Sequence, residues 1–153
     1  MNRLVLAAAL LALKGSRRKD GGLPLWLYVA AGVVALAPAA AVLPKVGADG
    51  VAFAAPIFDH SKVAIINEIS RLGVPPANPF FGVADEGIRL GYYYLWHFSA
   101  AELALASGIS GWEADAAMTW FTAFFTLSLM VGFAAWLAQR ATAGAFVLLL
   151  AIA

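Results

Sequence analysis

Two long uncharged segments flank one polar interval, and this pattern predicts helices that cross a membrane. Residues 21–44 contain no charged side chain, and residues 116–139 contain none either. At 1.5 Å per residue, a helix of about 24 residues is about 36 Å long, enough to cross a hydrocarbon core of about 30 Å. We therefore predict transmembrane helices over residues 21–44 and 110–140. The second begins with Ser110 and Glu113 in the capping-box spacing.

The polar interval, residues 45–109, is predicted to contain two helices that lie at the membrane surface. Over residues 60–72, apolar side chains recur at every third position among polar ones, namely at Val63, Ile66, Ile69 and Leu72. This spacing is typical of an amphipathic helix in the membrane interface. Gly73 is expected to end it. The tyrosine-rich segment 92–107 is short, so either a second interfacial helix or a short crossing fits it.

Charge supplies the predicted orientation. A basic cluster follows the apolar lead in residues 1–20 and consists of Lys14, Arg17, Arg18 and Lys19. Positive clusters favour the cytoplasmic side, so residues 45–109 are expected on the outer, periplasmic side of the inner or plasma membrane. If residues 92–107 do not cross, Arg140 also reaches the cytoplasm, which favours the interfacial alternative.

The two ends of the chain are apolar but short. Residues 1–13 fit the tail of an earlier helix or an interfacial segment better than a removable signal. Residues 141–153 predict the start of a truncated transmembrane helix. The expected fold class is therefore all-α, a polytopic helical membrane protein with two juxtamembrane interfacial helices in its first outer loop. Residues 45–56 are expected to be a connector.

Composition supports this class and excludes others. The hydrophobic share is 63%, against about 45–50% in soluble proteins. The basic cluster has no interleaved aromatic residues, which argues against a nucleic-acid partner and leaves membrane lipid as the expected one. The chain has no cysteine, so disulfides, thiolate catalysis and zinc–thiolate sites are excluded.

Asp59 is the candidate catalytic residue, since eight of the nine carboxylates lie between Asp49 and Asp115 and Asp59 directly precedes the predicted helix 60–72. A carboxylate at the outer membrane face is suited to accept a proton from an acceptor hydroxyl. The alternative is structural, because Asp is also a favoured N-cap. The two roles do not exclude each other.

Five further residues of this interval are candidates for substrate binding, namely His60, Lys62, Arg89, Tyr94 and His97. Lys62 and Arg89 suit a lipid phosphate, although cations also extend to the headgroups without a specific ligand. The histidines lack the i, i+4 spacing of a zinc motif. We therefore predict no metal ligands and no cofactor, and expect the histidines to make ordinary hydrogen bonds. Binding of a divalent metal is the alternative.

The order of these parts resembles the N-terminal part of GT-C type membrane glycosyltransferases, the group that contains protein O-mannosyltransferases and aminoarabinose transferases. The resemblance covers residues 22–140 and consists of a span, an acid that opens an amphipathic helix, a proline-bearing stretch, an aromatic helix and the segment beginning at Gly111. The Asn78-Pro79-Phe80 turn and the triple tyrosine at 92–94 are also similar to an uncharacterised prokaryotic membrane family with a YYY signature.

The resemblance implies transfer of a sugar from a polyprenyl-phosphate donor to an acceptor hydroxyl on the outer face, with Asp59 as general base. Many members carry a second acid after this Asp, where this chain has His60. Such enzymes use about ten or more spans, so the remaining helices of the same enzyme are expected as partners. The alternative is a non-enzymatic membrane subunit or a transporter segment whose outer loop binds a partner.

Overall fold

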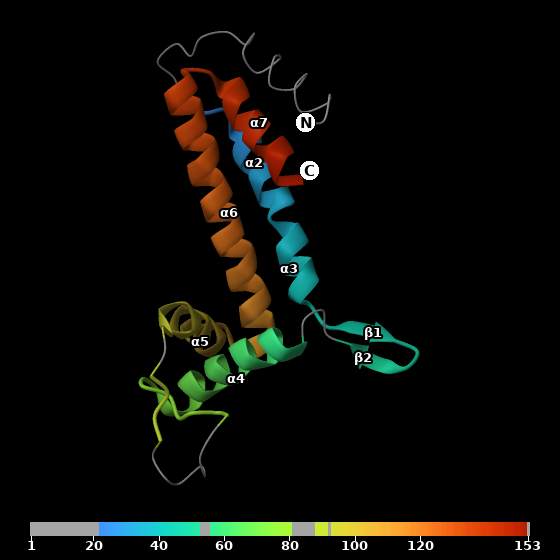
Figure 1. Cartoon of the computed structure of the whole chain (residues 1–153), viewed down its shortest axis with the longest axis vertical. Helices are drawn as coiled ribbons and strands as arrows, with labels where there is room; N and C mark the ends of the chain where they lie inside the picture. Colours follow the sequence, from blue (N-terminus) through green and yellow to red (C-terminus); the bar gives the residue numbers. More distant parts are fainter. Residues whose placement is uncertain (1–21, 53–55, 81–87, 92, 153) are drawn as a thin grey trace. The chain divides into compact units, whose positions relative to one another are not determined.

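The first predicted transmembrane segment forms two consecutive helices, α2 (Leu25–Val34) and α3 (Leu36–Val42) (Figure 1). The break at Ala35 precedes Pro38 by three residues, because proline has no N–H to bond the carbonyl one turn earlier and its ring crowds that carbonyl. This computed structural model describes residues 22–52, 56–80, 88–91 and 93–152, without the side chains of residues 51–59. The predicted segment 1–20 lies outside the described residues.

The described part of the chain is mostly helical, in agreement with the all-α prediction. It divides into two compact units: residues 38–119 form one, and the parts of the chain on either side form the other. Residues 38–119 are called the second unit and the flanking parts the first unit; the helix α6 (Gly111–Ala138) contributes its first turns to the second unit and the remainder to the first. Two helical segments are long and apolar enough to cross a membrane, Leu25–Val42 and Gly111–Ala138.

The first unit consists of α2, the larger part of α6 and α7 (Ala141–Ile152). Its core contains Leu27, Ala31, Val131 and Leu148. Its packing depends on small residues at the contacts. A Cβ atom on Gly144 would lie 2.8 Å from Val131 Cγ1. Trp120 donates its indole N–H to the carbonyl of Gly32 at 3.0 Å, which satisfies the polar end of a large ring in an apolar surrounding.

The predicted connector 45–56 leads from α3 to α4 and contains a β-hairpin that the sequence pattern did not predict. Strands β1 (Lys45–Gly47) and β2 (Gly50–Ala52) pair antiparallel, with Val46 opposite Val51. The turn between them is Ala48-Asp49, and Gly50 has φ +113°. An Asp-Gly pair between short apolar runs is a hairpin signal that the lack of sustained periodicity obscured.

The predicted helix 60–72 begins earlier, as α4 (Pro56–Leu72). Proline is favoured in the first turn of a helix because its missing N–H would have no partner there anyway. Three residues of the predicted apolar stripe are buried, Val63, Ile66 and Ile69. They do not face lipid as predicted: α4 packs against α5, and Ile66 and Ile69 share a core with alanines of α5 and α6. Leu72, at the helix end, is 45% exposed.

The predicted helix 92–107 begins later, as α5 (Leu95–Ser107), and ends at Gly108, which has φ +68°. At 1.5 Å per residue its 13 residues extend about 20 Å, less than the thickness of a hydrocarbon core. This length supports the interfacial alternative for the segment. Ala100, Ala101 and Ala104 face α4, and their small side chains permit close approach of the two helices.

The predicted capping box at the start of α6 is confirmed. Glu113 accepts a hydrogen bond from the backbone N–H of Ser110 at 2.7 Å, and the Ser110 hydroxyl accepts one from the N–H of Glu113 at 3.3 Å. Each side chain thus satisfies a backbone donor of the other. The segment 110–140 is helical from Gly111 to Ala138, and Gln139 follows with φ +54°.

Candidate functional site

A partly buried ion pair joins α4 to the start of α6. Lys62 of α4 lies 3.3 Å from each carboxylate oxygen of Asp115, which belongs to the first turns of α6. The Asp115 side chain is fully buried, whereas the Lys62 side chain is 29% exposed. A carboxylate removed from water requires such a partner. The pair therefore fixes the middle of α4 against the start of α6.

The same junction is tightly packed at the backbone. Gly111, the first residue of α6, lies so close to α4 that a Cβ atom there would collide with the side-chain amide of Asn67. Asn67 is five residues beyond Lys62 on α4. Close backbone approach and an ion pair on the same helix junction hold Lys62 in a defined position.

Lys62 and His97, two of the predicted site residues, are brought together by this packing. The ammonium group of Lys62 lies 6.0 Å from the centroid of the Trp96 ring, within the range of a cation–π contact. His97 of α5 is buried, and burial lowers its pKa below the ordinary value of 6.5, with a further decrease from the positive charge of Lys62. The imidazole is therefore neutral at pH 7 and has one donor and one acceptor nitrogen.

We expect NMR titration of His97 to show a midpoint below 6.5. Since the unfolded chain then binds more protons than the folded one, stability should fall as the pH drops through 6.5. Lys62→Met should raise the pKa of His97 by removing the nearby charge, while burial still keeps it low. Arg71→Met is the control, because Arg71 is an exposed cation that pairs with Glu68. A midpoint at or above the ordinary value would contradict this assignment.

His60 lies on the same helix, half a turn before Lys62, and its ring makes an edge-to-face contact with Trp112 of α6 at 5.8 Å between centroids. The residue itself is exposed. His60 therefore borders the same helix junction from the solvent side.

Asp59 is the fourth residue of α4, three positions before Lys62. Because the helix begins at Pro56, Asp59 does not precede it, and the N-cap interpretation is wrong. The side chain of Asp59 lies outside the described residues, so its predicted role as general base stays a prediction. Among the described side chains, no three potential metal ligands of the His, Asp or Glu type lie together.

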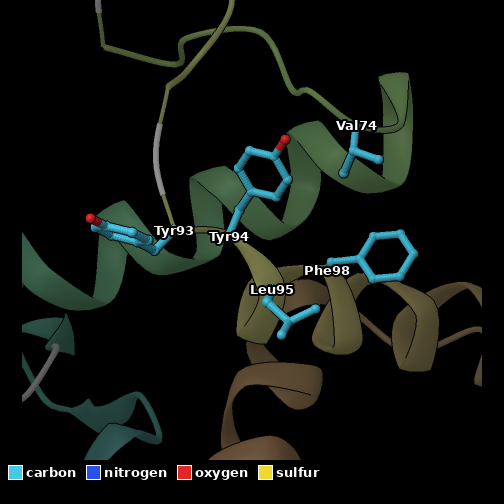
Figure 2. A pocket seen from close by; sticks show the side chains of 5 residues that line it. All are labelled: Val74, Tyr93, Tyr94, Leu95 and Phe98. Carbon is cyan, nitrogen blue, oxygen red and sulfur yellow. The ribbon is translucent and has the colours of Figure 1, made fainter.

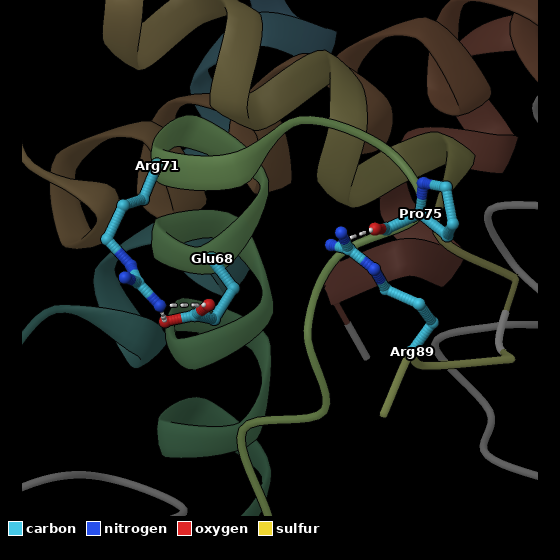
Figure 3. Close-up of polar contacts among 4 residues, drawn as sticks. All are labelled: Glu68, Arg71, Pro75 and Arg89. Carbon is cyan, nitrogen blue, oxygen red and sulfur yellow. Dashed lines mark hydrogen bonds and ion pairs between the residues drawn. The ribbon is translucent and has the colours of Figure 1, made fainter. Parts of the chain in front are cut away.

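Arg89 and Tyr94 belong to a second feature, at the C-terminal end of α4. Tyr94 lines a pocket of about 390 Å³ together with Val74, Tyr93, Leu95 and Phe98 (Figure 2). Arg89 donates a hydrogen bond from Nη1 to the carbonyl oxygen of Pro75 at 3.1 Å (Figure 3). Arg89 and Tyr94 therefore contact residues near the end of α4 and the start of α5, and no contact of either with Lys62 or Asp115 is described.

Sequence reasoning gave Asp115 no partner and did not identify Trp96 as a contact of Lys62. One signal was available for Asp115. A second acid two residues after the capping Glu113, at the start of an otherwise uncharged helix, is costly unless it has a partner. Its partner depends on tertiary packing between segments 53 residues apart.

Comparison with known proteins gives one informative similarity. Over 121 residues, 79% of this chain, the sequence is 41% identical to the uncharacterized protein y4nK of Sinorhizobium fredii (strain NBRC 101917 / NGR234). The matched region is only 18% of that protein's length. No family model and no solved structure matches the chain.

Proposed function

We propose that this chain is the N-terminal part of an integral-membrane glycosyltransferase that moves a sugar from a polyprenyl-phosphate donor to an acceptor hydroxyl on the outer face. The observation that carries the proposal is that α4 and α5 pack together. In the sequence they lie between two membrane-length helical segments. Asp59 lies near the start of the first helix of this pair. That is the position of the catalytic acid in the enzymes that the sequence resembles.

Membrane residence is supported by the surface of the first unit, which contains α2, most of α6 and α7. Helices that cross lipid carry apolar side chains on their outward faces, whereas the long helices of a soluble core are mostly buried. Here large apolar side chains are exposed along α6, with Phe133 at 62% and Leu129 at 59%. We infer a polytopic protein in the inner or plasma membrane, with residues 45–109 on the outer side.

In the proposed reaction, the Asp59 carboxylate accepts the proton of the acceptor hydroxyl. The acceptor oxygen forms a bond to the anomeric carbon of the sugar from the face opposite the phosphate. The bond from that carbon to the phosphate oxygen breaks, and polyprenyl phosphate leaves with the electron pair. His60, which is exposed one residue beyond Asp59, and the partly exposed Lys62 are the candidate contacts beside this base. His97 is buried, whereas Arg89 and Tyr94 belong to the separate feature at the C-terminal end of α4.

More than four fifths of the Sinorhizobium protein lies outside the match. This agrees with the proposal that the chain is one part of a larger enzyme. Cations that stabilise the phosphate leaving group would come from the remaining helices. This chain alone would then hold the base without a complete site.

The test is a transfer assay on membranes that contain the complete gene product carrying this chain, with a panel of radiolabelled polyprenyl-phosphate hexoses and pentoses. We expect label to move to an acceptor fraction and polyprenyl phosphate to be released in equal amount. A stably expressed protein that releases no polyprenyl phosphate from any donor would contradict the proposal. It would favour the non-enzymatic alternative, a subunit or transporter segment.

A further inference from the structure

An exposed apolar surface of residues 38–119 begins at Leu72, the last residue of the predicted stripe. With Val63, Ile66 and Ile69 buried, large apolar side chains emerge instead around the end of α4 and the start of α5. Tyr93 is 94% exposed and Leu95 is 78% exposed. Figure 2 shows Tyr94 between Tyr93 and Val74 at this end of the helix pair.

Backbone hydrogen bonds brace the loop that carries Val74, one wall of the pocket. Gly73 ends α4 with φ +75° and returns its N–H to the carbonyl of Ile69 at 2.8 Å. Beyond it, the N–H of Asn78 bonds the carbonyl of Ile88 at 3.0 Å, and the N–H of Leu90 bonds the carbonyl of Pro76 at 2.9 Å. The two sides of the loop are thereby tied together, and Val74 is held as one wall of the pocket.

A cation lies beside the apolar walls. Arg89 is exposed, and it reaches the carbonyl of Pro75, the residue that follows Val74 (Figure 3). Within the described part of the chain, no carboxylate pairs with Arg89, in contrast to Arg71, which pairs with Glu68 at 2.8 Å. A guanidinium keeps its charge at any physiological pH and binds phosphate oxygens through paired N–H groups.

We propose that this pocket binds one acyl chain of a bilayer phospholipid, with the lipid phosphate on Arg89. Apolar walls, tyrosine rings at the rim and an adjacent cation match the order of groups in a phospholipid, from chain to headgroup. The chain enters and leaves this unit through its two membrane-length helical segments, so phospholipid is the amphiphile present at highest concentration. The binding site rests on the proposed membrane location but not on sugar transfer.

Photocrosslinking tests the proposal. The full chain is reconstituted in vesicles of phosphatidylglycerol that carries a diazirine on one acyl chain, and crosslinked residues are mapped by mass spectrometry. We expect crosslinks at Val74 and within residues 93–98, in addition to those on the membrane helices. Crosslinks confined to α2, α6 and α7 would overturn the proposal, whatever the outcome of the transfer assay.

Variants separate the pocket from general surface charge. Arg89→Gln should weaken binding of the phospholipid in detergent, measured by native mass spectrometry, about tenfold, the effect of losing one charge-assisted hydrogen-bond pair. Val74→Trp should exclude the acyl chain by filling the pocket, and Leu95→Ser at its exposed wall provides a second test if Val74→Trp does not fold. The matched control is Arg71→Gln, which removes an exposed arginine that pairs with Glu68 and does not line the pocket.

Three results would overturn the proposal. Equal loss of binding in Arg71→Gln and Arg89→Gln would indicate a general charge effect. Unchanged binding in both pocket variants would leave the pocket without a lipid. Displacement of the phospholipid by an equimolar single-chain polyprenyl phosphate would assign the pocket to a different lipid.

Discussion

Lys62→Met is expected to lower the free energy of unfolding by about 3–5 kcal/mol, the cost of leaving a buried carboxylate without its cation. The Asp115 side chain is fully buried and cannot reach water when Lys62 is removed. Asp115→Asn should cost less, because the partly exposed lysine can turn toward solvent. Denaturant unfolding of the full chain in detergent micelles, followed by tryptophan fluorescence, measures both changes.

The double variant Lys62→Met/Asp115→Leu separates the cost of an unpaired charge from the net contribution of the pair. We expect it to recover most of the lost stability, since apolar replacements of buried pairs are often neutral. The control is Arg71→Met, whose exposed pair with Glu68 should contribute less than about 1 kcal/mol. If Lys62→Met costs no more than this control, the carboxylate does not depend on the lysine.

Local chemistry determined the parts of the fold that the sequence predicted correctly. The capping box at Ser110, the end of α4 at Gly73 and the helical character of residues 60–72 all depend on neighbours within one turn. The errors concern partners distant in sequence. A stripe of Val63, Ile66 and Ile69 fits a lipid surface and a protein core equally well, and only the alanine face of α5 decides between them.

The candidate site shows the same division. His60, Lys62 and His97 were identified because polar groups are rare in this chain, and their positions on α4 and α5 follow from helical periodicity. The contacts of Lys62 with Asp115 and of His60 with Trp112 depend on the packing of helices distant in the sequence, which no spacing rule along the chain specifies. Proline residues also have two different effects that the sequence alone did not distinguish. Pro56 begins helix α4, whereas Pro38 follows the break between α2 and α3.

Asp59→Asn is expected to reduce sugar transfer by about a factor of 10² to 10⁴, the usual contribution of a general base. Asparagine has nearly the same shape but cannot accept the proton of the acceptor hydroxyl at neutral pH. The amount of folded protein should not change, because Asp59 lies inside α4 rather than at its cap. The transfer assay described above, with protein quantified by immunoblot, measures activity and abundance in the same membranes.

Glu68→Gln is the matched control, since it neutralises another carboxylate on α4, which pairs with the exposed Arg71. Transfer should persist in this variant. Loss of transfer in Asp59→Asn would then result from the loss of the carboxylate at position 59 and not from a change in the net charge of α4.

The side of the membrane on which α4 lies can be tested independently. The chain has no native cysteine and His60 is exposed, so a His60→Cys variant should react with a membrane-impermeant maleimide from the outer side. Reaction from the cytoplasmic side alone would place α4 where no outer-face acceptor can reach Asp59, and the proposed reaction would fail with it.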